Sequence, residues 1–116
     1  MADHEVQVRV TSETLRRSAE ARGVVSEQPG IAPEVAAIEQ LHEALDAAVE
    51  GTGVGGTDDF DEFDDYWVVW LFGPDVDALV AAARGVVVEH RLMDGAYAFV
   101  TDPNAGDFRV GRRIDF

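Results

Sequence analysis

The sequence predicts a single α+β domain, and three observations lead to that prediction. The chain has 116 residues, which is enough for one compact domain and too few for two ordinary ones. Some segments repeat apolar residues every three to four positions, as amphipathic helices do. Others alternate apolar and polar residues or are dense in aromatic and β-branched ones, as strands are. Because the two kinds of segment are interleaved, the helices are expected to pack against one sheet.

The N-terminal part predicts a strand followed by an ambiguous segment. Over residues 5–11 every second residue is a valine with polar residues between, which indicates a strand with one buried face. Residues 12–30 fit either a short helix that ends at Gly23 or a mobile, extended segment, because few apolar residues would line the helix.

The next element is a helix over residues 33–50. Pro33 suits a first helical turn, and apolar residues recur at helical spacing while carboxylates occupy the opposite side. Gly51 is expected to supply the left-handed residue that ends it.

A strand over residues 66–72 is predicted next, and both of its faces are apolar. Asp75 is placed to cap a second helix that Gly85 is expected to end. For residues 86–88, β-branched composition favours a strand over another helical turn.

The C-terminal part predicts a hairpin. Residues 96–101 read as a strand, and residues 102–107, "DPNAGD", have the composition of a turn. The last residues alternate, with Phe108, Val110, Ile114 and Phe116 on one face. In order, the elements predict a ferredoxin-like βαββαβ sandwich with a C-terminal β-hairpin extension.

A family resemblance agrees with this order. "GTG" at residues 51–53, an acidic stretch, and "LFGPDVDAL" at residues 71–79 resemble a group of small bacterial proteins of unknown function that have a ferredoxin-like fold. The resemblance covers about residues 33–102, and the longer acidic run here departs from the pattern. Since no activity is known for the group, the resemblance implies no site residue.

The glycine-rich stretch after the first long helix does not predict a nucleotide site. "GTGVGG", residues 51–56, matches G-x-G-x-x-G, but it follows a helix C-terminus and leads into carboxylates, whereas a phosphate loop precedes a helix N-terminus. The acidic run is interpreted as a solvated loop, or a short strand paired with residues 66–72, anchored by Phe60 and Phe63. No EF-hand register fits it. Its six carboxylates are the candidate partner-binding residues: Asp58, Asp59, Asp61, Glu62, Asp64 and Asp65.

Motifs for catalysis are missing from the sequence. There is no cysteine, and "HEALD" at residues 42–46 lacks the second histidine of a zincin helix. No serine lies in a nucleophile turn, and there is no lysine for a Schiff base. The sequence therefore predicts no enzyme, no cofactor and no metal site.

The formal net charge of −14 is the strongest bulk feature, and every positive residue is an arginine. So acidic a surface disfavours nucleic acid and anionic lipid as partners. It is compatible with a basic protein partner or with genome-wide composition. With neither a secretory signal nor an apolar run long enough for a membrane helix, a cytoplasmic protein is expected.

The doubly apolar strand raises the question of what covers the second face of the sheet. The chain's own residues 12–30 or C-terminus, a second copy, or an apolar ligand are the three alternatives. The arginines near the C-terminus could pair with the acidic run, within one chain or across a dimer. The candidate interface residues are Tyr66, Trp67, Trp70, Arg109 and Arg113.

Three function classes follow. The first, which the sequence favours, is a non-catalytic acidic interaction module that self-associates as a homodimer. The second is an acidic inhibitor or immunity-type protein that binds a basic partner. The third is a regulator that binds a small ligand or a cation.

Overall fold

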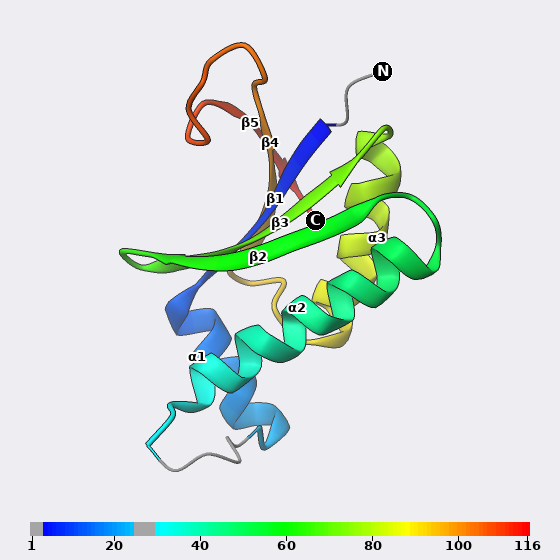
Figure 1. The fold of residues 1–116 in the computed structure, drawn as a ribbon. Helices are drawn as coiled ribbons and strands as arrows, with labels where there is room; N and C mark the ends of the chain where they lie inside the picture. Colours follow the sequence, from blue (N-terminus) through cyan, green and yellow to red (C-terminus); the bar gives the residue numbers. More distant parts are fainter. Residues whose placement is uncertain (1–3, 25–29) are drawn as a thin grey trace.

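A computed structural model describes residues 4–24 and 30–116. Their strands form one five-stranded antiparallel sheet in the order β2-β3-β1-β4-β5, and the helices lie on one face of it (Figure 1). The architecture is thus mixed α+β, as the sequence predicts. The elements are β1 (His4–Thr11), α1 (Ser12–Arg22), α2 (Pro33–Gly51), β2 (Gly56–Phe63), β3 (Tyr66–Gly73), α3 (Val76–Glu89), β4 (Ala96–Thr101) and β5 (Gly111–Asp115).

The core lies between the sheet and the helices. Val8 of β1 pairs with Val69 of β3 on one side and Ala98 of β4 on the other, so one apolar row crosses the three central strands. Leu41 and Leu45 of α2 are fully buried in the same apolar cluster. The valine alternation of residues 5–11 therefore faces the helices, and each fully buried valine or leucine contributes about 1.5–3 kcal/mol.

The ambiguous segment after β1 is a helix through Arg22. Thr11 is its N-cap, and the Thr11 side chain accepts a hydrogen bond from the Thr14 amide at 3.2 Å. Gly23 ends the helix with φ of 67°, where a glycine is favoured. The rest of the segment, residues 25–29, lies outside the described residues.

Two predicted helix ends are wrong. Gly51 is still helical, and the left-handed residue is Gly53, with φ of 73°. The helix α3 passes through Gly85 and ends at Glu89, so the strand expected at residues 86–88 does not form. Val87 continues the buried stripe of this helix, and tertiary packing therefore outweighs β-propensity.

The acidic run is also not a loop. Gly56–Phe63 form the edge strand β2, paired with β3, which is the alternative that the sequence left open. Phe60 packs against the core between His42 and Trp67, at ring distances of 5.5 and 6.0 Å. It thereby anchors the strand, as expected, whereas Phe63, the second expected anchor, lies outside the core cluster and stacks on Tyr66.

His90, just after α3, is a buried titratable residue. Only 8% of it is exposed, and its Nδ1 has no hydrogen-bond partner in the described part of the chain. Burial, reinforced by the Arg22 guanidinium and opposed by Glu89, lowers the pKa of His90 below 6.5. The neutral imidazole is therefore the form that the folded chain holds at neutral pH.

The lowered pKa of His90 predicts a loss of stability in mild acid. Below pH 6.5 the unfolded chain takes up a proton on His90 that the folded chain resists, so stability present above that pH decreases as the pH falls. We expect the unfolding free energy of the parent, minus that of His90→Gln, to decrease between pH 7.5 and about pH 5 in urea titrations. A difference that stays constant over this range would contradict the assignment.

Candidate functional site

The sheet face turned away from the helices is rich in aromatic rings. Here Gln7 lies between Trp70 and Phe99 on the neighbouring strands, and Arg9 lies between Val68 and Tyr97. Gln7, Arg9 and Val68 are buried, although no helix covers them. Something else must therefore shield the centre of this open face.

The loop of residues 102–110 connects β4 and β5 (Figure 1), and the contacts of its Phe108 provide that shield. The ring of Phe108 stacks on Phe63 at 4.9 Å and meets Trp70 edge-on at 5.7 Å. The Phe108 carbonyl accepts hydrogen bonds from the Gln7 side chain at 2.7 Å and from Arg9 at 3.2 Å. Part of the second face is thus covered by the C-terminal part of the chain, which is one of the alternatives that the sequence left open.

Arg9, in the middle strand, contacts the loop of residues 102–110 from the sheet. Its guanidinium lies over Phe99, 3.9 Å from the ring centroid, and its Nε donates to the Gln7 side chain at 2.9 Å. Only 8% of Arg9 is exposed, and no carboxylate lies within 4 Å of it in the described part of the chain. The buried charge is therefore balanced by π-faces and by carbonyl oxygens instead of an ion pair.

A hollow of about 300 Å³ opens between this loop and β2. We call it the acidic groove. Carboxylates form one part of its lining and aromatic rings the other. The lining residues are Glu5, Asp58, Asp59, Asp61, Trp70, Phe72 and Phe108.

A β-bulge in β2 brings consecutive aspartates into the acidic groove. Thr57 pairs with Leu71 and Phe60 pairs with Val69, so three steps along β2 match two steps along β3, and one extra residue is inserted. Asp58 and Asp59 consequently both lie opposite Trp70. Successive residues of a regular strand would point to opposite faces.

One hydrogen bond fixes the orientation of Trp70. The indole Nε1 donates to an Asp61 carboxylate oxygen at 2.8 Å, which sets the angle of the ring at the floor of the acidic groove. Asp58, Asp59 and Asp61 are all exposed, so their charges are accessible to a partner. The acidic groove therefore presents negative charge beside the π-face of a tryptophan, which is a setting for a cation.

The structure separates the predicted acidic residues. Asp58, Asp59 and Asp61 line the acidic groove, whereas Asp64 and Asp65 form the turn between β2 and β3. The sixth carboxylate, Glu62, pairs opposite Trp67 at the edge of the sheet.

The predicted interface residues are separated too. Tyr66 and Trp70 lie on the open face, but Trp67 points into the core, where its Nε1 donates to Glu34 at 2.8 Å. Arg109 and Arg113 pair with nearby carboxylates, as described next, and the predicted pairing with the acidic run does not form in this chain.

Local ion pairs occupy these two arginines. Arg109 bonds Asp107 at 3.2 Å, and Arg113 bonds Asp115 at 2.7 Å. The Arg109 side chain and amide, through hydrogen bonds, hold the pKa of the Asp107 carboxyl below its usual value. Both pairs are exposed, so each adds little stability.

Sequence reasoning did not assign Glu5, Phe72 or Phe108 to the acidic groove. The period of two in β1 places Glu5 on the same side as Gln7 and Arg9, and Phe72 follows Trp70 by two positions in β3. That signal was available from the sequence. The position of Phe108 was not, because it depends on how a loop folds over the sheet.

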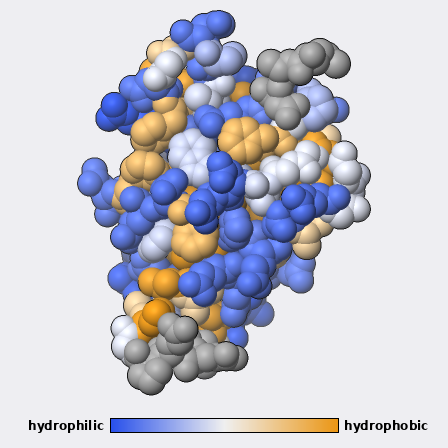
Figure 2. Space-filling model, in the orientation of Figure 1, coloured by the Kyte–Doolittle hydropathy of each residue, from blue (hydrophilic) through white to orange (hydrophobic). Residues whose placement is uncertain are grey.

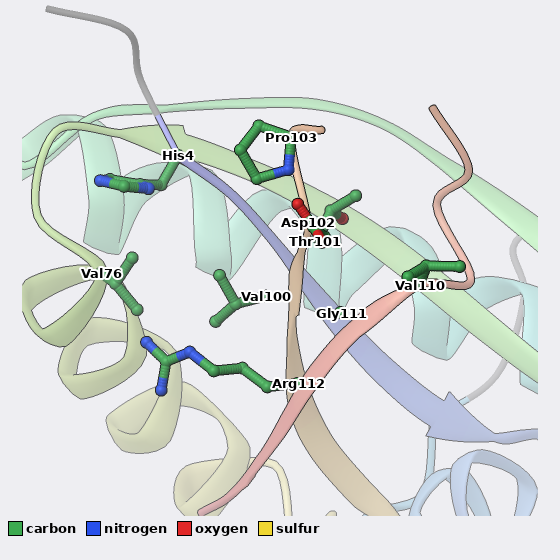
Figure 3. A pocket seen from close by; sticks show the side chains of 9 residues that line it. All are labelled: His4, Val76, Val100, Thr101, Asp102, Pro103, Val110, Gly111 and Arg112. Carbon is green, nitrogen blue, oxygen red and sulfur yellow. The ribbon is translucent and has the colours of Figure 1, made fainter. Parts of the chain in front are cut away.

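A second hollow, of about 420 Å³, lies where the β4–β5 hairpin meets the start of α3 (Figure 3). Val76 and Val100 form apolar walls, and the Arg112 side chain extends toward the helix. His4 stands at the same opening. These groups do not converge on one point, so this hollow indicates no particular class of ligand, in contrast to the acidic groove.

Other site types find no support in the described residues. Within residues 4–24 and 30–116 no group of three histidine or carboxylate side chains is arranged to hold a metal ion. His42 is engaged instead with the Asp58 carbonyl, 2.8 Å from its Nε2. None of the helices in that part of the chain combines the length and the hydrophobicity needed to cross a membrane.

Comparisons with known proteins find no match for this chain, whether against family models, curated protein sequences or solved structures.

The role of Arg9 leads to a prediction about the loop of residues 102–110. Arg9→Met keeps a long apolar stem but removes the donor to Phe108 and the cation over Phe99. We expect the loop to detach more often, and trypsin to cleave after Arg109 faster than in the parent. The variant should lose about 1–3 kcal/mol of unfolding free energy.

The control for this prediction is Arg84→Met, because Arg84 is exposed on α3 and makes no ion pair in the described part of the chain. Equal cleavage after Arg109 in the parent and in Arg9→Met would show that Arg9 does not hold the loop.

Proposed function

We propose that the chain is a non-catalytic interaction module that binds a basic segment of a protein partner in the acidic groove. This proposal takes up the second function class, the acidic protein with a basic partner. A ferredoxin-like fold with a fifth strand is part of the same proposal, supported by the strand order β2-β3-β1-β4 and by helices on one face. A cytoplasmic location stays a prediction from composition.

The observation that supports this function best is the mixed lining of the acidic groove. Carboxylates from β1 and β2 stand beside Trp70 and Phe108, so one cationic side chain could contact both kinds of group at once. A volume of about 300 Å³ is at the lower end for ligand pockets, which suits a side chain better than a drug-sized molecule.

The net charge of the whole chain also supports a basic protein as the partner. A net charge of −14 attracts basic proteins over a distance and speeds their encounter, in a way that salt screens. On the side seen in Figure 2, hydrophilic residues form most of the surface, and apolar side chains occur among them in small groups. A partner approaching this surface would therefore meet hydrophilic side chains first.

The non-catalytic part of the proposal is supported by the similarity of the carboxylates. Asp58, Asp59 and Asp61 are all exposed, whereas general acid–base catalysis by two carboxylates needs unlike environments that separate their pKa values.

A binding titration tests the proposed function. The probe is a capped eight-residue peptide of alternating arginine and glycine, and the readout is the Trp70 indole N–H resonance, assigned with Trp67→Phe. We expect saturable binding that weakens as salt is raised. The double variant Asp59→Asn, Asp61→Asn should lower the affinity about tenfold, since each exposed charge pair is worth up to about 1 kcal/mol.

The matched control changes the charge equally but elsewhere. Glu39→Gln, Glu43→Gln removes two exposed carboxylates from α2, away from the acidic groove, and should leave the affinity nearly unchanged. If the two double variants weaken binding equally, the peptide responds only to overall charge. The acidic groove is then not a site.

Self-association as a homodimer is the second candidate, and one observation favours it. The loop of residues 102–110 covers only part of the open face, and the rings of Tyr66, Tyr97 and Phe99 remain partly exposed beside it. Partly exposed aromatic rings gathered on one face are typical of an interface.

Light scattering tests this second candidate. If the open face joins two copies, the parent should have the mass of a dimer, and Tyr97→Ser should be a folded monomer. Because Trp67 lies in the core, replacing it with a small polar residue such as serine would destabilise the fold without testing the interface. A parent that stays monomeric up to millimolar concentration rules the homodimer out.

A further inference from the structure

We propose that the acidic groove selects the guanidinium of arginine over the ammonium of lysine. The inference rests on the proposed function and adds the chemical class of the side chain that is recognised. It is drawn from a comparison between the two halves of the open face.

On the other half of this face, each arginine lies over an aromatic ring. Arg9 lies over Phe99 at 3.9 Å, and Arg113 lies over Tyr97 at 4.1 Å. The loop repeats the arrangement at a longer distance, with Arg109 5.7 Å from the Phe108 centroid. Stacking of a guanidinium on a ring is therefore the recurrent way in which this face holds a cation.

Trp70, like Phe63 and Phe72, has no arginine over its ring in the described part of the chain, and it is the tryptophan of this face. Tryptophan attracts cations more strongly than the other aromatic side chains. Its N–H donates to Asp61, which makes the ring richer in electrons and more attractive to a cation. The negative charge that would balance that cation is already present, on Glu5, Asp58 and Asp59.

The mixed lining of the acidic groove favours a planar cation. A guanidinium is planar, so it can stack on Trp70 while its edge donates hydrogen bonds to the carboxylates beside the ring. It is also more weakly hydrated than an ammonium, so it loses less solvation at an aromatic surface. A lysine ammonium satisfies the carboxylates but gains less from the ring.

A pair of matched peptides tests the inference. The two capped eight-residue peptides alternate glycine with either arginine or lysine, so they have the same charge and length. With the Trp70 indole N–H resonance as readout, we expect the arginine peptide to bind the parent about tenfold more tightly than the lysine peptide, as one well-placed cation–π contact allows.

Trp70→Leu should reduce this ratio to about twofold or less, because the carboxylates remain while the ring is lost. Since that variant lacks the indole signal, its affinities are measured by calorimetry, with the parent measured in the same way. Trp67→Phe is the control for a change of tryptophan and should keep the full preference for arginine. Circular dichroism shows whether Trp70→Leu is folded, and Trp70→Ile, which also lacks a ring and suits a strand, serves in its place if it is not.

The outcomes distinguish a failure of this inference from a failure of the proposed function. If the two peptides bind the parent with equal affinity, the acidic groove is still a site for a basic segment, but the proposed selectivity for arginine is overturned. A preference for arginine that persists without the ring would place the selectivity elsewhere, and would overturn the inference too. If neither peptide binds the parent, the proposed function fails, and the inference fails with it.

Discussion

The contacts of the buried Arg9 guanidinium are the interactions on which the open face of the sheet depends. Arg9 sits in the middle strand of the sheet, over Phe99, and donates to the Phe108 carbonyl of a loop about one hundred residues away in sequence. Without that contact the loop of residues 102–110 would be held by the Gln7 side chain and by the rings of Phe63 and Trp70. Because Phe108 also lines the acidic groove, one buried cation organises both the cover of the sheet and the shape of the candidate site.

The two faces of the sheet follow different chemical rules. On the helix side, branched apolar residues such as Val8 and Leu71 form a closely packed core. On the open face, aromatic rings alternate with polar and charged side chains. Most of the buried apolar side chains lie on the first face, so the second can hold features that cost stability, such as the crowded carboxylates of β2.

The sequence predicted the parts of the fold that depend on local periodicity. The helix beginning at Pro33, the strand beginning at Tyr66 and the cap at Asp75 all have short-range signals, and all are present. The predictions went wrong where packing between elements decides. Gly85 lies inside a helix because the buried residues that follow it need a core to pack on, and a propensity argument cannot detect that core.

For the candidate site, the sequence showed the charge but not the geometry. The acidic run was evident, and so was Trp70. The sequence did not show that Asp58 and Asp59 stand together opposite that ring, because strand alternation predicts that they point apart. Nor did it show that Phe108 returns over the sheet to form part of the acidic groove.

The β-bulge in β2 has a consequence for how such a site could arise or disappear. A single-residue deletion at residue 58 or 59 would restore regular pairing with β3, and it would leave the helices and the remaining strands in place. The same fold would then carry one aspartate fewer beside Trp70, and the residues N-terminal to the deletion would keep their faces. Among relatives of this chain, the length of β2 would therefore record the presence of the acidic groove better than the number of acidic residues does.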